Sequence, residues 1–268
     1  MQIDRNNIFN ILKEYDISPS KDYGQNFLVD SNICKSIIAL LNINNEDNVL
    51  EIGPGVGSLT HFLVTDNNLV SAVEIDSNLT FVLNSFYKGY SNLIIINEDI
   101  RKVDISSYTK IVANLPYNIT TELVIYLLKN ASNAQKVVLM CQLETFNHFY
   151  DTKGKEYGPT SVFLHLLGDI KKEFIVKPGS FIPAPKCSSI VFSFTPNSVC
   201  SFEDAYKTYL LAKQLFLSRR KTIFNNLNSV IKNKERTTFI LDSLGIIKTK
   251  RPEEISYKDF LNIYSFIK

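Results

Sequence analysis

Cysteine and histidine are scarce in this sequence. Its 268 residues include four cysteines and three histidines, and no two cysteines form a C-x-x-C pair. Zinc sites draw on closely spaced side chains of these two types, so we expect no metal site. Thiols without a pairing pattern are typical of a reduced compartment, and we expect a cytoplasmic protein.

Long apolar runs are missing as well. No stretch approaches the roughly eighteen consecutive apolar residues of a membrane-spanning helix. The first residues also lack the basic segment followed by an apolar one that marks a signal peptide. We therefore expect neither a membrane span nor export.

The sequence does contain enough apolar material for a packed core. Hydrophobic residues make up 45% of the chain and charged residues 21%, which is the balance of a globular protein rather than a disordered one. A length of 268 residues predicts one large domain with at most one small one.

Short apolar runs recur through the first two-thirds of the chain and predict buried strands. The expected strands are 48–52, 69–74, 92–96, 110–113 and 135–140. The expected crossover helices include 58–65, 78–87 and 121–129. Alternation of this kind is typical of a doubly wound parallel sheet. Two later runs, 173–176 and 189–194, have no helix between them and predict an antiparallel edge.

The pattern changes after about residue 200. From there onward it is helical, with breaks at Asn225-Asn226, Gly245 and Pro252 and no convincing strand. We therefore predict an α/β fold in two domains, with a Rossmann-like sheet over 1–200 and a small all-helical domain over 201–268.

A glycine-rich segment, Glu51-Ile-Gly-Pro-Gly-Val-Gly57, follows the first expected strand. At the carboxyl edge of a parallel sheet, Gly53 and Gly55 let a ligand approach the backbone because they carry no side chain. A dinucleotide fingerprint has a further glycine where this chain has Ser58. The spacing favours S-adenosylmethionine over a nicotinamide dinucleotide, and the alternative is an ordinary tight turn.

Acidic residues follow the next two strands. Glu74 can accept hydrogen bonds from ribose hydroxyls, and Asp99 can accept one from an adenine amino group. Because these strand ends meet at the edge that carries the glycine loop, the two acids favour an adenosyl site. The alternative is that both are ordinary surface acids.

The fourth strand ends in Asn114-Leu-Pro-Tyr117. The lone pair of an exocyclic base amine is delocalised into the ring, so an enzyme that methylates it must restore its nucleophilicity. The Asn114 side-chain oxygen and the Leu115 backbone carbonyl can accept the amine hydrogens. Pro116 stiffens the loop, and Tyr117 offers a ring on which the base can stack. The pattern favours amino-group methylation over a simple β-turn.

A later segment, Phe181-Ile-Pro-Ala-Pro185, is less specific. It is compatible with a proline-stiffened edge strand. It is also compatible with a pocket in which Phe181 closes the second face of an extruded base.

These motifs make the chain resemble the bacterial small-subunit (16S) ribosomal RNA adenine dimethyltransferases, the kasugamycin-sensitivity dimethylase family. The resemblance covers nearly the whole chain. It is carried by Gly24-Gln-Asn-Phe-Leu28, 51–60, 114–121, Tyr157-Gly158, Val176-Lys-Pro178, 181–186, Ser218-Arg-Arg-Lys-Thr222, Leu244-Gly-Ile246 and 251–256.

The resemblance implies a class I S-adenosylmethionine-dependent methyltransferase sheet with a small helical domain. It also implies a reaction, the transfer of four methyl groups from S-adenosylmethionine to two adjacent adenosines. These adenosines lie in a hairpin loop near the 3′ end of 16S RNA, within the small ribosomal subunit, and the implied role is in subunit biogenesis. Nothing in the sequence suggests an obligate dimer, so we expect a monomer.

The same resemblance assigns roles to individual positions. The residues implied to bind the cofactor are Gln25, Asn26, Leu28, Gly53, Gly55, Glu74, Asp99, Ile100 and Asn114. The residues implied at the methyl-transfer point are Asn114, Leu115, Pro116, Tyr117 and Phe181. Tyr117 and Phe181 would flank the base.

One stretch departs from the family pattern. Where the family usually has Gln-Lys-Glu-Val-Ala followed by an arginine, this chain has Gln142-Leu-Glu-Thr-Phe146 leading to His148, which we interpret as a surface residue. Two positive charges near the RNA path are therefore missing. This departure keeps open a non-catalytic RNA-binding or assembly factor.

Two further alternatives concern the substrate. Large-subunit RNA methylases share the glycine loop but usually carry isoleucine in place of Leu115, so Leu115 and the basic stretch 219–221 favour the small-subunit enzyme. The asparagine–proline–tyrosine chemistry also suits an amine on DNA or a protein glutamine. A short basic helical domain favours a structured RNA.

The net charge of +2 hides a division along the chain. Residues 1–170 carry 12 Lys and Arg against 19 Asp and Glu, a charge of −7, whereas residues 171–268 carry 17 against 8, a charge of +9. A basic second part can neutralise RNA phosphates. The candidate RNA contacts are Arg219, Arg220, Lys221, Lys248, Lys250 and Arg251. Ordinary solvated helix faces are the alternative.

Overall fold

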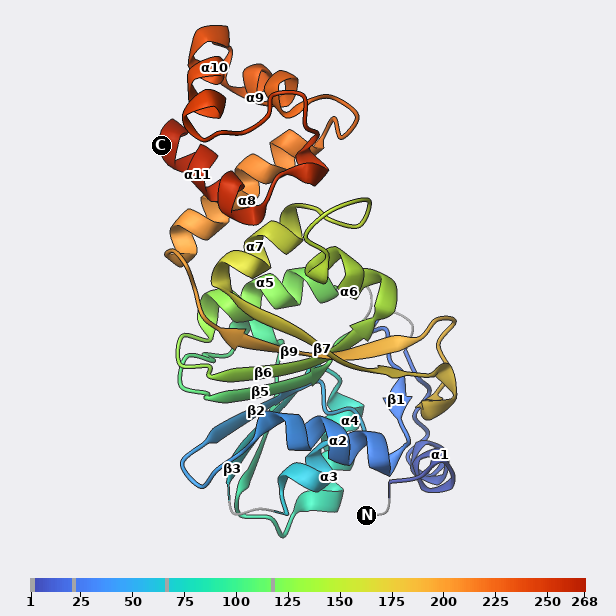
Figure 1. The fold of residues 1–268 in the computed structure, drawn as a ribbon. Coiled ribbons are helices and arrows are strands. Elements are labelled where there is room, and N and C mark those ends of the chain that lie inside the picture. Colours follow the sequence, from blue (N-terminus) through green and yellow to red (C-terminus); the bar gives the residue numbers. More distant parts are fainter. Residues whose placement is uncertain (1–2, 21–22, 66–67, 117–118) are drawn as a thin grey trace. The chain divides into compact units, whose positions relative to one another are not determined.

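The computed structural model describes residues 3–20, 23–65, 68–116 and 119–268 (Figure 1). The chain divides into two compact units, each built from two segments. Unit 1 comprises Met1–Leu143 and Lys171–Thr195, and unit 2 comprises Glu144–Ile170 and Pro196–Lys268. We describe each unit by itself.

Unit 1 contains a seven-stranded mixed sheet in the order β4-β3-β2-β5-β6-β9-β7. Its strands are β2 (Asn48–Ile52), β3 (Leu69–Glu74), β4 (Leu93–Asn97), β5 (Lys110–Asn114), β6 (Lys136–Gln142), β7 (Gly168–Val176) and β9 (Ser189–Pro196). The first five strands of the order pair in parallel, and β9 pairs with β6 in the antiparallel direction. The predicted doubly wound sheet with an antiparallel edge is confirmed.

The middle strands of this sheet are apolar because both of their faces are covered. Val49, Leu50, Val112 and Val138 are fully buried. Helices α2 (Ser31–Leu41), α3 (Thr60–Leu63) and α4 (Ser77–Tyr87) lie on one face, and α5 (Thr120–Asn130) lies on the other (Figure 1). This two-sided cover leaves the carboxyl ends of the parallel strands as the open edge for a site.

Unit 1 also contains a short antiparallel pair that the sequence analysis missed. Strand β1 (Phe27–Leu28) pairs with β8 (Phe181–Ile182), with Leu28 opposite Phe181. The N-terminal helix α1 (Arg5–Glu14) is capped by Asp4, and the Arg5 guanidinium donates to the carbonyls of Gly179 and Phe181. Strands of two residues carry no recognisable period, so only tertiary contacts reveal them.

Unit 2 is helical. It contains most of α6 (Leu143–Tyr150) together with α7 (Pro159–Leu167), α8 (Phe202–Phe216), α9 (Ile223–Ile231), α10 (Lys234–Ser243) and α11 (Tyr257–Ile267). Tyr157, just before α7, packs edge-on against Phe216 of α8 and Phe260 of α11. Phe163 of α7 packs against Phe202 of α8. These contacts group residues 144–170 with the C-terminal helices, whereas the expected division placed all of 1–200 in one domain.

The expected break at Asn225-Asn226 is wrong, because α9 runs through both residues. Asn226 is buried, and its amide donates to the carbonyls of Ser218, Lys221 and Thr222, so this polar residue holds the turn that precedes the helix. The other two breaks are confirmed. Gly245 follows α10 with φ of +64°, and Pro252 begins a 3-10 turn, η3 (Pro252–Glu254).

Two features are absent from the described residues. No helix there is long and apolar enough to cross a membrane. No three His, Cys, Asp or Glu side chains within those same ranges are grouped so that they could hold a metal ion.

Candidate functional site

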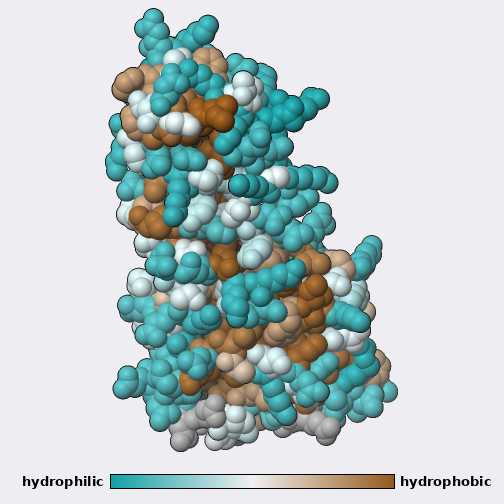
Figure 2. All heavy atoms as spheres, in the orientation of Figure 1, coloured by the Kyte–Doolittle hydropathy of each residue, from teal (hydrophilic) through white to brown (hydrophobic). Residues whose placement is uncertain are grey.

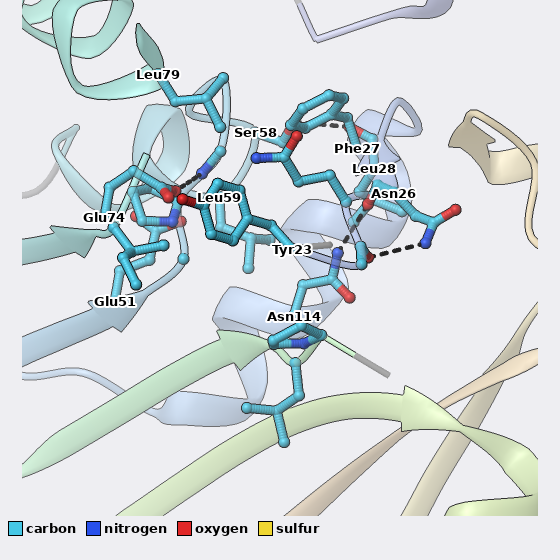
Figure 3. A pocket seen from close by; sticks show the side chains of 18 residues that line it. Tyr23, Asn26, Phe27, Leu28, Glu51, Ser58, Leu59, Glu74, Leu79 and Asn114 are labelled. Carbon is cyan, nitrogen blue, oxygen red and sulfur yellow. Dashed lines mark hydrogen bonds between the residues drawn. The ribbon is translucent and has the colours of Figure 1, made fainter. Parts of the chain in front are cut away.

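The carboxyl ends of β2, β3 and β5 border an open pocket in unit 1 (Figure 3). The pocket has a cavity volume of about 110 Å³ and opens to solvent. Its walls are formed by residues 23–28, Glu51, Gly53, Pro54, Gly55, Ser58, Leu59, Glu74, Ile75, Leu79, Asn114, Leu115 and Pro116. Most of the expected cofactor residues are among them.

The glycine loop forms one wall and needs its glycines. Gly53 and Gly55 have φ of +65° and +62°, a left-handed conformation that side chains disfavour. A Cβ on Gly55 would lie 3.0 Å from the Phe27 ring, and one on Gly57 would lie 2.9 Å from Tyr87. The loop is thus shaped both by its own turn and by the segment that crosses it.

Glu74 joins this loop to β3. Its Oε2 accepts from the Gly55 amide at 3.0 Å, and its Oε1 accepts from the Asp76 amide at 3.0 Å. Burial raises the pKa of Glu74, while the two backbone hydrogen bonds act in the opposite direction. Each carboxylate oxygen has a second lone pair, so the group can still accept hydroxyl hydrogens from the pocket side.

Glu51 lies beneath the loop at the end of β2. Its Oε2 accepts from the Thr60 hydroxyl at 2.6 Å, and its side chain is almost fully buried although it borders the pocket. Burial raises the pKa of Glu51 to about 7. From the sequence, Glu51 is recognisable only as the start of the glycine motif, which indicates no role for its carboxyl group.

The segment 23–28 is held over the pocket by hydrogen bonds at both ends. The Gln25 side-chain Nε2 donates to the Asp76 carboxylate at 3.0 Å. The Gln25 side-chain Oε1 accepts from the Ser20 backbone amide at 2.7 Å. At the other end, the Ser58 hydroxyl donates to the Leu28 carbonyl at 2.7 Å. These bonds fix the segment against α4 and the glycine loop.

Asn114 connects the same segment to β5. Its Nδ2 donates to the Asn26 backbone carbonyl at 3.0 Å. The Asn26 side-chain Nδ2 in turn donates to the Gly24 backbone carbonyl at 3.1 Å. Leu115 is buried, with its backbone amide donating to the Met140 carbonyl, and Pro116 lines the pocket. Because the Asn114 nitrogen is used by Asn26, its oxygen is the atom left to accept from a ligand.

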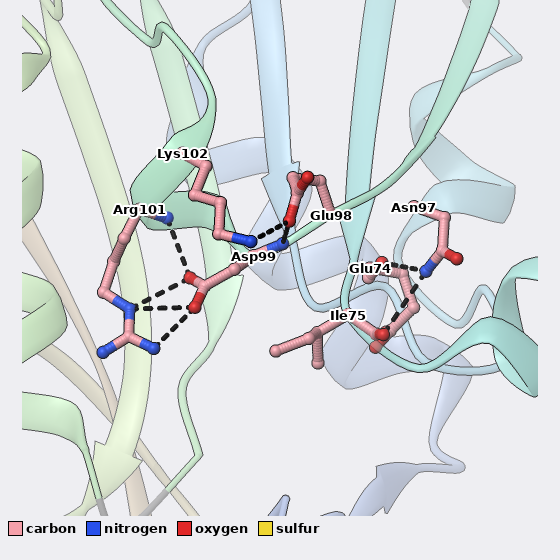
Figure 4. Close-up of polar contacts among 7 residues, drawn as sticks. All are labelled: Glu74, Ile75, Asn97, Glu98, Asp99, Arg101 and Lys102. Atoms are coloured by element: carbon pink, nitrogen blue, oxygen red, sulfur yellow. Dashed lines mark hydrogen bonds and ion pairs between the residues drawn. The ribbon is translucent and has the colours of Figure 1, made fainter.

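Asp99 and Ile100 do not line the pocket. Asp99 accepts from the Arg101 backbone amide and from the Arg101 guanidinium with both carboxylate oxygens (Figure 4). The Arg101 hydrogen bonds lower the pKa of Asp99. Ile100 is buried. In this structure the Asp99 carboxylate is therefore paired with its own neighbour.

The two aromatic residues expected to flank a base have different outcomes. Phe181 is fully buried in the core of unit 1 and does not line the pocket, because β8 pairs with β1 and turns this ring inward. Tyr117 lies outside the described residues. A stacking role for either residue stays a prediction.

Several pocket residues were not expected from the sequence. Tyr23, Leu59, Ile75 and Leu79 all line the pocket, and the Tyr23 ring lies beside Glu74 (Figure 3). For two of them, the position in the sequence could have indicated a place in the pocket. Tyr23 directly precedes the Gly24 motif, and Ile75 lies between two acids at a strand end. These residues supply the apolar part of the wall.

The candidate RNA residues of unit 2 fall into two groups. Arg219 donates to the carbonyls of Gly154, Lys155 and Tyr157 and lies 3.4 Å from a Glu253 oxygen, so its guanidinium holds unit 2 together. Lys248 pairs with Asp242 at 2.8 Å. Within the described ranges, no acidic side chain pairs with the remaining four, Arg220, Lys221, Lys250 and Arg251.

The chain brings this second group together at the start of α9. The Ile223 amide donates to the Lys250 carbonyl at 2.6 Å, so the loop that carries Lys250 and Arg251 lies beside the residues that precede the helix. Arg220 and Lys221 immediately precede Thr222, the N-cap of α9. Four cationic residues thus lie on the two segments that meet at one helix N-terminus.

The divergent stretch lies on α6. His148 is half exposed, and its Nδ1 is 3.4 Å from a Glu156 oxygen within unit 2. This placement agrees with the interpretation of His148 as a surface residue.

Comparisons with known proteins agree on one family. The model of the family described as Ribosomal RNA adenine dimethylase matches residues 18–268. A curated relative from Levilactobacillus brevis, named Ribosomal RNA small subunit methyltransferase A, is 35% identical over 94% of this chain and 91% of its own length. A relative of the same name from Legionella pneumophila is 38% identical over 93% and 98%.

Solved structures show the same fold. A dimethyladenosine transferase from Plasmodium falciparum has a TM-score of 0.76 and 25% identity, covering 88% of this chain and 95% of its own. The 23S rRNA methyltransferase ErmE has a TM-score of 0.71 at 22% identity, covering 90% and 99%, and at that identity the likeness concerns the fold alone.

Proposed function

Because the chain belongs to the ribosomal RNA adenine dimethylase family, we propose that it dimethylates two adjacent adenosines of 16S ribosomal RNA with S-adenosylmethionine. The target adenosines would be those of the hairpin loop near the 3′ end, in small-subunit biogenesis in the cytoplasm. The observation that carries this proposal is the orientation of Asn114, whose amide is held by Asn26 at the border of the glycine-loop pocket. Unit 1 would bind the cofactor, and unit 2 would contact RNA.

The pocket fits S-adenosylmethionine, which when bound supplies an electrophilic methyl group on a sulfonium. Gly53 and Gly55 line the pocket without side chains, and the open space beside Gly53, where a Cβ would have no atom within 4 Å, leaves room for its amino-acid part. Glu74 offers buried carboxylate lone pairs for the ribose hydroxyls. The segment that carries Gln25, Asn26 and Leu28 would cover the bound molecule.

Asn114 and Leu115 would prepare the target amine. With its nitrogen donating to Asn26, the Asn114 oxygen can accept one amine hydrogen, and the Leu115 backbone carbonyl can accept the other. This arrangement localises the amine lone pair toward the methyl group. Methyl transfer would form the new N–C bond and break the C–S bond, leaving S-adenosylhomocysteine, and the amine proton would pass to solvent. The rate then depends mainly on positioning.

Asp99 would reach an adenine only after exchanging part of its Arg101 contact. Both carboxylate oxygens accept from that guanidinium. The Arg101 side chain is 55% exposed, so water can accept the hydrogen bonds that its guanidinium gives up in the exchange. The adenine role of Asp99 is therefore a proposal that includes a rearrangement.

A non-catalytic assembly factor is the second candidate. The divergent stretch on α6 motivates it, but the pocket residues Gly53, Glu74 and Asn114 are all in place. The presence of these three residues in one pocket favours the enzyme. We also propose that the protein acts as a monomer and without a metal.

The test is a methylation assay with labelled S-adenosylmethionine and small ribosomal subunits that lack the modification. We expect dimethyladenosine in the digested RNA, and we expect Asn114→Ala to abolish it. Large subunits, duplex DNA and a protein extract serve as competitors that test the alternative substrates. Label in another substrate, or no dimethyladenosine at all, would contradict the proposal.

A further inference from the structure

Unit 2 exposes a pair of phenylalanines that none of the assigned roles uses. Phe239 of α10 is 64% exposed and Phe266 of α11 is 40% exposed. Their ring centroids lie 6.4 Å apart at an interplanar angle of 68°. The core-facing residues of the two helices are different ones, including Ile240 and Phe260. The aromatic pair is therefore a surface feature and is not needed to fill the core.

Three cations accompany this aromatic pair. Lys232 ends α9, and Lys234 and Arg236 lie in the first turn of α10. The Arg236 guanidinium donates weakly to the Phe266 backbone carbonyl at 3.4 Å, which places it beside the last turn of α11. In the part of the chain that the structure describes, no acidic side chain forms an ion pair with any of the three.

Two of the nearby acids are paired with other cations. Asp242, further along α10, pairs with Lys248, and Asp204 pairs with Lys268. Glu235 is the acid that remains in the first turn of α10. We call the five residues Lys232, Lys234, Arg236, Phe239 and Phe266 the α10 patch. On the face shown in Figure 2, apolar groups lie among hydrophilic side chains over the α9–α10 end of unit 2.

The α10 patch is separate from the cations at the start of α9. Arg220 and Lys221 precede Thr222, the N-cap of α9, whereas Lys232 is its C-cap. Nine helical residues span roughly 13 Å at 1.5 Å per residue. One bound RNA can therefore contact both groups through different phosphates.

We propose that the α10 patch is a second contact for ribosomal RNA, in which an unpaired base stacks on the more exposed ring, Phe239, and Phe266 packs edge-on against that ring. Lys232, Lys234 and Arg236 would neutralise the neighbouring phosphates. Aromatic rings next to cations without ion pairs fit single-stranded RNA. Unpaired bases can stack on the rings, and the cations can neutralise the anionic RNA backbone. An apolar protein partner would not use the cations. This inference rests on the proposed RNA substrate.

The rings are tested by measuring the affinity for small ribosomal subunits. We expect the double variant Phe239→Leu, Phe266→Leu to bind at least about 5-fold more weakly, since base–aromatic stacking accounts for roughly 1–3 kcal/mol per base. Leucine keeps the apolar surface and removes the aromatic face. We expect Phe239→Tyr to bind like the unchanged protein. Phe9→Leu, an equally simple change at an exposed ring of unit 1, serves as the matched control.

The cations are tested through salt dependence. Replacing Lys232, Lys234 and Arg236 by Gln should reduce the slope of log affinity against log salt by roughly 2–3, since each phosphate contact contributes about 0.7–0.9. The same substitutions should leave the binding of S-adenosylhomocysteine unchanged, because the pocket lies within unit 1. An unchanged salt slope would overturn the phosphate contacts.

Two results would overturn the stacking contact. Unchanged binding by the leucine variant, together with weakened binding by Phe239→Ala, would indicate a protein partner. Unchanged binding by both variants would show that the patch is not a contact at all. The proposed function is tested separately, by measuring methyl transfer by the unchanged protein. If the unchanged protein methylates subunits and the variants bind equally well, only the α10 patch inference fails.

Discussion

The Asn114 amide nitrogen donates to the Asn26 backbone carbonyl at 3.0 Å, and this bond fixes which end of the amide faces the pocket. In Asn114→Asp, the nitrogen is replaced by an oxygen that would face the Asn26 carbonyl, and the two acceptors would repel each other. We expect methyl transfer to fall at least about 10²-fold, the typical cost of removing a preorganised polar group. The measurement is single-turnover methylation of small subunits. Methyl transfer at the original rate by the aspartate variant would show that Asn26 does not orient the amide.

Tyr23 covers the Glu74 side of the pocket and is 44% exposed. We expect Tyr23→Ala to weaken the binding of S-adenosylhomocysteine by about 10-fold, because the exposed ring would become buried against the ligand. Tyr23→Phe should bind like the unchanged protein if the ring acts by contact. Calorimetric titration measures both, with Phe9→Ala as the control for losing an exposed ring. Equal affinity of Tyr23→Ala and the unchanged protein would exclude such a contact.

Glu51 should make stability depend on pH. Burial raises its pKa to about 7, so between pH of about 4.5 and 7 the folded chain binds more protons here than the unfolded chain does. Stability from this group is present below the unfolded pKa and is lost as the pH rises through about 7. The free energy of unfolding of the unchanged protein, relative to Glu51→Gln, should therefore fall by up to about 3 kcal/mol across this range. Urea unfolding at several pH values measures the difference, and a difference that stays constant with pH would contradict the prediction.

Arg219 and Arg220 are neighbours with different expected roles. Arg219 holds three carbonyls of residues 154–157, so Arg219→Gln should destabilise the protein by about 1–3 kcal/mol. Arg220 is exposed without an ion pair among the described residues, so Arg220→Gln should change stability by less than about 0.5 kcal/mol. Arg220→Gln should instead weaken RNA binding more strongly at low salt than at high salt. Denaturant unfolding and RNA titration of both variants check these two predictions. A destabilised Arg220→Gln together with a fully stable Arg219→Gln would contradict the roles given to the two residues.

The parallel part of the sheet could be predicted closely from the sequence. Residues 48–52 and 69–74 form β2 and β3 with the expected bounds, because strands covered on both faces are continuous apolar runs. The two-residue strands β1 and β8 carry no such pattern. The grouping of residues 144–170 with unit 2 depends on the packing of Tyr157 and Phe163 against later helices, which no local signal contains.

The candidate site likewise has residues whose place follows from the sequence and others whose place depends on contacts made in the folded chain. Gly53, Glu74 and Asn114 line one pocket as expected, because consecutive parallel strands end at one edge of the sheet. Asp99 does not line the pocket as expected. Its carboxylate instead forms an ion pair with Arg101, two residues away in a 3-10 turn. Phe181 differs because a tertiary contact, the pairing of β8 with β1, buries its ring.

The place of β9 in the sheet order has a consequence for synthesis of the chain on the ribosome. Residues 189–196 form the last strand to be made, yet they lie between β6 and β7. Until they emerge, β7 has no neighbouring strand in the sheet, and the nascent chain carries an open edge along β6, whose residues 137–141 are buried in the finished protein. Open apolar edges pair readily with other chains. Chains truncated before residue 189 should therefore be prone to aggregation, and the sheet can be completed only after residues 189–196 have left the ribosome.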